Sequence, residues 1–255
     1  MSVPAVQYPK AFSSKQGSGF FADVRTLWRL FLGQPRKGSH AQRLQAFYSP
    51  QAERYDSFRA RLLHGRQDLI DRLAIAPGEY IVELGCGTGS SLDRISSQVC
   101  DLARIDLVDL CPALLEQARK RATGYQTVRV IEADATLWKP DQPVDGVFLS
   151  YALTMIPQWP EVLSSAYAML KPGGRLGIVD FHLPASGNRF ANAVWKAWFS
   201  HDGVHLSAEH LPRLQQMFAE NFCSERRAHI PYLSGLCAPY YLFVGKKHSV
   251  QGDAE

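Results

Sequence analysis

Residues 81–89 read Ile81-Val82-Glu83-Leu84-Gly85-Cys86-Gly87-Thr88-Gly89. A short apolar run ends in an acidic residue and then in three glycines at alternate positions, and polar residues follow. This pattern predicts a strand, a tight turn and a helix over 90–98. Glycines at 85 and 87 let the backbone turn and approach a ligand closely, and the amides at a helix N-terminus can receive an anion. The stretch therefore predicts a binding site for a ligand with a nucleotide-like body.

Length and composition fit one α/β domain with an appended segment. The chain has 255 residues, of which 46% are hydrophobic, enough for one substantial core. A net charge of +4 gives only weak support to a nucleic-acid or membrane partner. The five cysteines, at 86, 100, 111, 223 and 237, form no C-x-x-C pair, so we expect no disulfide framework and no metal site. The N-terminus lacks the apolar segment of a signal peptide, and we expect a cytoplasmic protein.

The first part of the chain divides into a lead over 1–19 without periodicity and a basic, helical part over 20–75. Apolar residues, most of them aromatic, recur at helical spacing from Phe20 to Leu32, with arginines on the other side. Two interpretations of this helix stay open. It packs on its own domain, or it lies on a membrane surface and covers a lipid substrate.

Strands and helices alternate over 76–247, ahead of a short tail over 248–255. Besides the strand before the glycines, the sequence predicts strands at 103–110, 127–131, 144–150, 175–180, 224–230 and 239–245, and helices at 112–121, 159–170 and 211–222. A turn is expected at 171–174, which reads Lys-Pro-Gly-Gly. Because crossovers between parallel strands are right-handed, this alternation predicts a doubly wound, mostly parallel sheet with its ligand at the carboxyl ends of the strands.

Asp109 is the candidate to hold the ribose of that ligand. It lies twenty residues after Gly89 and closes the second predicted strand just before Cys111. An acidic side chain at this place can accept hydrogen bonds from both ribose hydroxyls. Asp106 competes for the role, but it lies in the middle of the strand and its side chain should leave the ligand edge.

The spacing of the glycines separates two kinds of nucleotide. A dinucleotide fingerprint, G-x-G-x-x-G, needs a glycine at position 90, where this chain has Ser90. The G-x-G-x-G spacing after Glu83 resembles the first motif of the class I S-adenosylmethionine-dependent methyltransferases. That resemblance covers residues 45–247 and implies a Rossmann-like, seven-stranded sheet with an antiparallel final hairpin and a helical lid ahead of the glycines.

The resemblance also implies the cofactor S-adenosyl-L-methionine, its product S-adenosyl-L-homocysteine, and a set of binding residues. Asp134 would approach the adenine amino group, and Tyr55, beside Asp56 in the lid, would shield the sulfonium. The residues expected to bind the cofactor are Tyr48, Tyr55, Glu83, Gly85, Cys86, Gly87, Asp109, Leu110, Asp134, Ala135, Ser150 and Tyr151. A loop or helix-capping carboxylate is the other interpretation of Asp134, and half-buried packing residues that of the lid tyrosines.

Several segments outside these motifs resemble the N-methyltransferase of betaine-lipid synthesis. They are Tyr55-Asp56-Ser57-Phe58-Arg59, His64-Gly65-Arg66, Val108-Asp109-Leu110-Cys111-Pro112, Pro231-Tyr232-Leu233 and Ala238-Pro239-Tyr240-Tyr241. The enzymes of that family trimethylate the amino group of diacylglyceryl-homoserine. This resemblance implies a lipid substrate, contact with the inner membrane surface, and a partner enzyme that makes the homoserine lipid.

Methyl transfer from a sulfonium is an in-line displacement that needs no metal, so alignment, desolvation and charge placement carry catalysis. The acceptor amine must be neutral to attack, and Tyr151, His182 and His205 are the expected catalytic residues. A trimethylated product is a fixed cation, which suits aromatic faces. The residues expected around the substrate are Trp195, Trp198, His201, Asp202, Tyr232, Tyr240 and Tyr241. Each of these is individually as well explained by core or rim packing.

Three other functions stay open at the level of sequence. A nucleic-acid methyltransferase is disfavoured, because Ser150 is followed by Tyr151-Ala152-Leu153, with neither a Pro-Pro-aromatic segment nor a nucleophilic cysteine. We therefore expect no nucleic-acid partner. A soluble small-molecule N- or O-methyltransferase is the second alternative. A cofactor-binding protein without enzymatic activity is the third.

Overall fold

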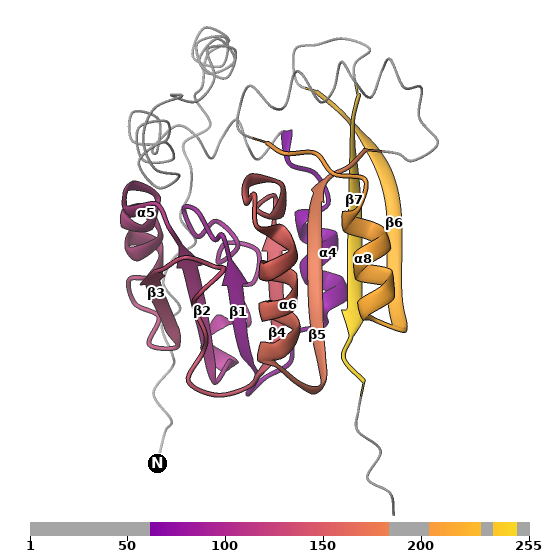
Figure 1. Cartoon of the computed structure of the whole chain (residues 1–255). Coiled ribbons are helices and arrows are strands. Elements are labelled where there is room, and N and C mark those ends of the chain that lie inside the picture. The colour runs from indigo at the N-terminus through magenta and orange to yellow at the C-terminus, as the bar shows by residue number, and fades with distance from the viewer. Residues whose placement is uncertain (1–61, 184–203, 231–236, 249–255) are drawn as a thin grey trace, which may run out of the picture.

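The computed structural model of the chain describes residues 62–183, 204–230 and 237–248. These residues form a seven-stranded sheet in the order β3-β2-β1-β4-β5-β7-β6 (Figure 1). The strands are β1 (Tyr80–Leu84), β2 (Arg104–Asp109), β3 (Val128–Glu132), β4 (Val144–Ser150), β5 (Leu170–Phe181), β6 (Glu220–His229) and β7 (Cys237–Lys246). The strands β1 to β5 are parallel to one another, whereas β7 pairs antiparallel with both β5 and β6. The predicted mostly parallel, doubly wound sheet is confirmed.

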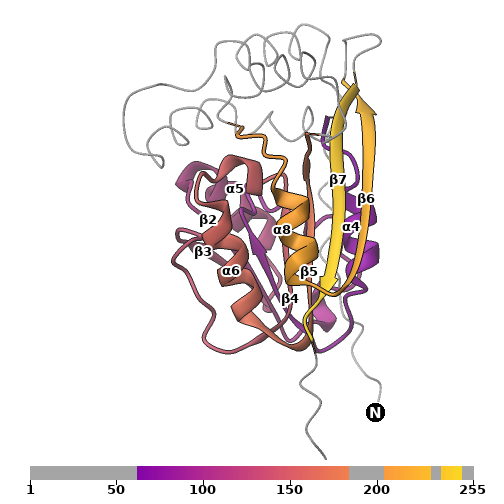
Figure 2. The same cartoon turned by 45° about the vertical axis from the view of Figure 1, so that its right-hand side comes forward.

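Helices cover both faces of the sheet and bury it. Residues of α4 (Arg66–Leu73), of the turns over 89–102 and of α5 (Pro112–Ala122) pack on one face. Residues of α6 (Trp159–Met169) and α8 (His210–Met217) pack on the other (Figures 1 and 2). Every residue of β1 is buried, as expected for a central parallel strand covered on both faces. Among the helices in the described ranges, none is both long and apolar enough to cross a bilayer.

The helix predicted over 90–98 is wrong. The chain instead makes successive turns, in which amides bond to carbonyls three or four residues back, and then a short 3-10 helix, η1 (Val99–Asp101). The hydroxyls of Ser90 and Ser91 bond to Arg66 and Glu83, respectively, rather than to neighbouring backbone groups. These long-range contacts fix the backbone in a shape that a regular helix would not allow. The expected anion site at a helix N-terminus is therefore absent from this stretch.

Two further boundaries differ from the prediction. The helix predicted over 211–222 ends at Met217, because Phe218 is buried against Gly245 of β7 and the chain then enters β6 at Glu220. The turn predicted over 171–174 is part of β5. Leu170 already pairs with Val144, and the register shifts before Arg175 pairs with Gly146. A bulge absorbs the glycines there without ending the strand.

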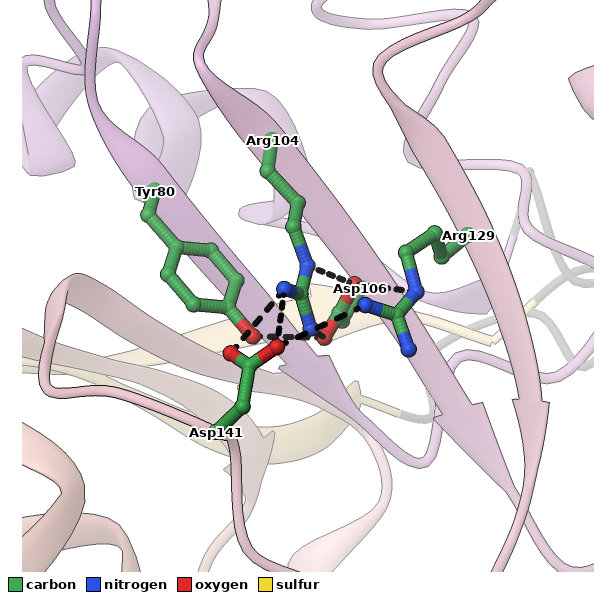
Figure 3. A network of polar contacts seen from close by, with 5 residues as sticks. All are labelled: Tyr80, Arg104, Asp106, Arg129 and Asp141. Atoms are coloured by element: carbon green, nitrogen blue, oxygen red, sulfur yellow. Dashed lines mark hydrogen bonds and ion pairs between the residues drawn. The ribbon is translucent and has the colours of Figure 1, made fainter.

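A network of charges ties the first three strands together at their amino ends (Figure 3). The carboxylate of Asp106 is fully buried and accepts hydrogen bonds from the Tyr80 hydroxyl (2.6 Å) and from Nε of Arg104 (2.8 Å). Arg129 lies 3.8 Å from the same carboxylate, and Arg104 also holds Asp141 with two hydrogen bonds. Burial and the hydrogen bond to Asp106 raise the pKa of the Tyr80 phenol. Asp106 thus serves the fold at the end of the sheet opposite to the carboxyl ends of the strands.

Replacing this buried carboxylate should destabilise the sheet. We expect Asp106→Asn to lower the free energy of unfolding by about 3 kcal/mol, because it leaves the Arg104 guanidinium beside a neutral partner. Asp141→Asn is the matched control. Its side chain is 62% exposed, so this variant should unfold near the wild-type midpoint. Urea unfolding measures both, and equal losses would contradict the central position of Asp106.

Candidate active site

The glycine turn after β1 is bonded to the end of β2. The amides of Gly85 and Cys86 donate to the carbonyl of Val108, at 2.8 and 3.1 Å. Gly85, Gly87 and Gly89 all have positive φ values, of 74°, 56° and 69°. A Cβ on Gly85 would lie 2.4 Å from the Cβ of Ala152, so only glycine fits there. The turn therefore brings bare backbone to the carboxyl ends of β1 and β4.

Asp109 at the end of β2 faces this turn. Its Oδ2 accepts a hydrogen bond from the Gly87 amide at 2.8 Å, and its Oδ1 accepts one from the Cys111 amide at 2.9 Å. These contacts hold the carboxylate at the cleft, where the prediction puts the ribose hydroxyls. Asp109 lines the cleft described below, whereas Asp106 lies in the network at the other end of the sheet.

A cleft of about 730 Å³, counting the solvent at its mouth, opens beside this turn. Seven of the predicted cofactor residues line it, namely Gly85, Gly87, Asp109, Leu110, Asp134, Ala135 and Tyr151. The other lining residues are Cys111, Leu114, Ala133, Ala152, Met155, Ile156 and Gln158. Two carboxylates, one aromatic ring and mainly apolar walls suit a cationic nucleoside.

Asp134 is a capping carboxylate that also lines the cleft, and its contact with an adenine amino group stays a prediction. Its Oδ1 accepts hydrogen bonds from the amide and the hydroxyl of Thr136, at 2.8 and 2.7 Å, as a capping carboxylate does. It also lines the cleft. The cap fixes the orientation of the carboxylate, which is a requirement for recognising an adenine amino group.

Three residues predicted to bind the cofactor are buried and do not line the described part of the cleft. The carboxylate of Glu83 is buried and accepts a hydrogen bond from the Ser91 hydroxyl. Burial raises the pKa of the Cys86 thiol well above its usual value, so the thiol stays neutral. The hydroxyl of Ser150 accepts a hydrogen bond from Arg66 at 3.0 Å. None of the three is among the residues that line the cleft within the described ranges, so cofactor contact from each of them stays a prediction.

Tyr151 lines the cleft in a strained conformation. Its φ is 54°, in the left-handed region that non-glycine residues rarely adopt. Its amide donates to the carbonyl of Val179 and its hydroxyl to the carbonyl of His64, both at 2.8 Å. Its ring meets that of Phe181 edge-on, at 4.8 Å between centroids. Backbone strain of this kind is typical of functional sites, and a catalytic or cofactor-binding role for Tyr151 stays a prediction.

The two predicted catalytic histidines do not line the described part of the cleft. The His182 side chain is buried, and its Nε2 lies 2.9 Å from the carboxylate of Glu225. His205 is exposed, and its amide donates to the carbonyl of Thr154 at 2.6 Å. Both lie near the carboxyl end of β5, as predicted, and a catalytic role for either stays a prediction.

Tyr240 and Tyr241 do not form one aromatic surface. Successive residues of a strand point to opposite faces of the sheet. Tyr240 packs on the α4 side, where its ring leaves no room for a Cβ on Gly65. Tyr241 is wholly buried on the α8 side, and burial raises the pKa of its phenol well above the usual value. Tyr241 is thus not exposed in the part of the chain that the structure describes, and a substrate contact from it stays a prediction.

The remaining predicted residues lie outside the described ranges. They are Tyr48, Tyr55, Trp195, Trp198, His201, Asp202 and Tyr232. The lead over 1–19 and the amphipathic helix over 20–32 lie outside them as well.

Arg66 is a site residue to which sequence reasoning gave no role. It opens α4 and is nearly buried, with Nε donating to Ser150 and Nη2 to the Ser90 hydroxyl at 2.7 Å. It thus places a guanidinium between the end of β4 and the glycine turn. The signal in the sequence was an arginine in the first turn of a helix, where a positive charge is unfavourable for the helix dipole and needs another reason.

Gly85 should be required for ligand binding. We expect Gly85→Ala to weaken the binding of S-adenosylhomocysteine at least about tenfold, because the new Cβ would push Ala152 into the cleft. Gly78→Ala is the matched control. Its φ is similar, at 79°, but nothing lies within 4 Å of the added Cβ. It should cost about 1 kcal/mol of stability and leave binding unchanged in calorimetry. Equal affinities of the two variants would contradict the close packing inferred for Gly85.

Asp109 should carry much of the affinity for the ribose. Asp109→Asn removes a charged acceptor, and calorimetry should show S-adenosylhomocysteine binding about ten to a hundred times more weakly. The exposed Asp101 of η1, replaced by asparagine, serves as the control and should bind as the wild type does. An unchanged affinity of Asp109→Asn would exclude the ribose from this position.

Comparisons with known proteins agree with this geometry. A family model described as a methyltransferase domain matches residues 81–174, which run from β1 into β5. 2-Phytyl-1,4-naphtoquinone methyltransferase of Thermosynechococcus vestitus is 28% identical over 217 residues, which cover 76% of this chain and 96% of that protein. Trans-aconitate 2-methyltransferase of Escherichia coli is 32% identical over 130 residues, 51% of this chain and 49% of that protein.

A solved structure shows the same fold. It is phosphoethanolamine N-methyltransferase 2 of Haemonchus contortus in complex with S-adenosyl-L-methionine, with a TM-score of 0.66 and 13% identity. The superposition covers 84% of this chain and 61% of that one. The matched domain contains the glycine turn, Asp109, Asp134 and Tyr151, which are among the residues that line the cleft. The chain is an S-adenosylmethionine-dependent class I methyltransferase.

Proposed function

We propose that this enzyme methylates the amino group of diacylglyceryl-homoserine, three times in succession, and so makes a betaine lipid. The observation that supports the proposal is where the segments that resemble the betaine-lipid enzyme lie. His64-Gly65-Arg66 and Tyr240 are far apart in sequence but meet beside Tyr151 at the edge of the cleft.

Three contacts form this meeting point. The carbonyl of His64 accepts a hydrogen bond of 2.8 Å from the hydroxyl of Tyr151. Gly65 passes so close to the Tyr240 ring that an added Cβ would lie 2.8 Å from it. Arg66 donates to Ser150, the residue before Tyr151. Residues that carry the resemblance therefore support the side of the cleft next to the cofactor motifs, where an acceptor would enter.

The chemistry required of the protein is modest. S-adenosylmethionine supplies an electrophilic methyl group on a sulfonium. Asp109 and the glycine turn would hold its nucleoside, and Met155 and Ile156 would exclude water from the reacting groups. The face of Tyr151 would lie beside the positive charge, in a cation–π contact. The acceptor amine must lose a proton before each attack, and we expect His182 or His205 to assist.

Access to a diacyl substrate requires the enzyme to reach a bilayer. We propose that the helix over 20–32 lies on the inner membrane surface, with aromatics in the boundary and arginines against anionic head groups. An enzyme that makes the homoserine lipid would then supply the substrate within the same membrane.

A second candidate acceptor follows from the relatives. The Thermosynechococcus protein is named for a naphthoquinone that carries a phytyl chain, and so for a lipophilic acceptor. The Escherichia coli protein is named for a small acid instead. The first agrees with a lipid acceptor and the second with the alternative of a soluble small-molecule methyltransferase.

One experiment separates the three acceptors. The full chain is incubated with methyl-labelled S-adenosylmethionine and one of three acceptors: diacylglyceryl-homoserine in vesicles, a demethylated phytyl-naphthoquinone, or trans-aconitate. Mass spectrometry then identifies the methylated products. We expect mono-, di- and trimethylated homoserine lipid, and markedly less product with Asp109→Asn at a cofactor concentration that does not saturate the variant. Methylation of the quinone or the acid alone would replace the betaine-lipid proposal.

A further inference from the structure

The end of β5 holds a carboxylate that the site described above does not use. Asp180 is fully buried, and Thr154 donates to both of its oxygens. The Thr154 hydroxyl bonds to Oδ1 at 2.6 Å and the Thr154 amide to Oδ2 at 3.0 Å. The amide of Phe181 also donates to Oδ1, at 2.8 Å. A buried carboxylate costs free energy that an apolar side chain would not, so its presence beside a cleft calls for a reason.

Thr154 connects this carboxylate to the cleft. It lies in η2 (Leu153–Met155), and its side chain is buried behind the wall. Ala152, Met155 and Ile156, on either side of it in sequence, line the cleft. The carbonyl of Thr154 accepts a hydrogen bond of 2.6 Å from the amide of His205. Thr154 is therefore bonded both to Asp180 of β5 and to the chain at His205.

We propose that Asp180 is a positioning residue, which through Thr154 holds the wall over 152–156 at the place that cofactor and acceptor require. Met155 and Ile156 are both half-buried, so a small rotation of η2 would move them into the cleft or away from it. Displacements of about 1 Å can cost a hundredfold in rate when reacting groups must align. The inference rests on methyl transfer in this cleft and not on the identity of the acceptor.

The surroundings of Asp180 give this role a dependence on pH. Burial raises the pKa of Asp180 to about 6. Tyr241 pairs with it across the strands, with Cys223 of β6 beyond, and the rings of His182 and His210 lie 6.0 and 6.3 Å from that of Tyr241. The carboxylate of Glu225, in β6, forms a hydrogen bond with the His182 ring. Burial lowers the pKa of His210 to about 4 and raises that of Tyr241, so both are neutral when Asp180 titrates.

Protonation should affect binding and stability in opposite directions. A proton on Asp180 occupies one acceptor position, which weakens the hold on Thr154, so affinity for the cofactor should fall as the pH drops through about 6. The pKa is higher in the folded than in the unfolded chain. Protonation of Asp180 therefore favours folding, and its contribution to stability increases as the pH falls from about 6 towards the usual aspartate value. A purely structural role would produce only the second effect.

The test is calorimetry of the full chain with S-adenosylhomocysteine from about pH 5 to about pH 8. Wild-type affinity should fall about fivefold towards the acid end, whereas Asp180→Asn should show a flat profile. The difference between the two proteins isolates Asp180, because His182, His210, Cys223, Glu225 and Tyr241 are common to both. Identical profiles would overturn the proposal.

Thr154 provides a second, independent variant. Thr154→Val removes the hydroxyl and keeps the shape, and should weaken binding about fivefold and speed amide exchange over 153–156 about tenfold. Thr154→Ser restores the hydroxyl and should be within about twofold of the wild type. If Thr154→Val lowers the melting temperature but leaves affinity and exchange unchanged, Asp180 has only a structural role. Because the ligand is the cofactor product, an incorrect acceptor assignment would not alter any of these outcomes.

Discussion

The hydrogen bonds from Gly85 and Cys86 to the carbonyl of Val108 are the constraint on which the rest of the site depends. They form because β1 and β2 lie parallel with Leu84 opposite Val108, so both strands end at the same edge of the sheet. The next residue of β2 is Asp109, which then meets the amide of Gly87. A slip of register by one residue would turn Asp109 to the other face and leave the turn without its anchor.

The features that the sequence predicted are those fixed by local chemistry. Alternation of apolar strands with helices follows from burial on both faces, and the G-x-G-x-G spacing follows from three backbone positions with positive φ. Asp109 could be preferred over Asp106 because the last residue of a parallel strand lies at the ligand edge. Each of these arguments uses only the residue and its immediate neighbours in the chain.

The features that the sequence did not predict depend on side-chain partners that lie 8 to 26 residues away in the chain. The turns over 90–98 exist because Ser90 meets Arg66 and Ser91 meets Glu83. The sequence predicts Asp180 only as the end of a strand, because Thr154, whose hydroxyl donates to its carboxylate, comes 26 residues earlier. The spacing of apolar residues along the sequence does not indicate such side-chain pairs. They follow from the parallel order of β1, β4 and β5, which must be known first.

The two ends of the sheet differ in what their buried polar residues do. At the amino ends, Asp106 gathers two arginines and a tyrosine into a network that ties β1, β2 and β3 together. At the carboxyl ends, Tyr151 has a strained backbone and Asp180 is a buried carboxylate, both of which cost free energy. Six residues of β2 separate the ends by roughly 20 Å, at about 3.3 Å per residue. The strained backbone of Tyr151 and the buried carboxylate of Asp180 therefore lie at the end of the sheet that carries the cleft, and the network that stabilises the strands lies at the other end.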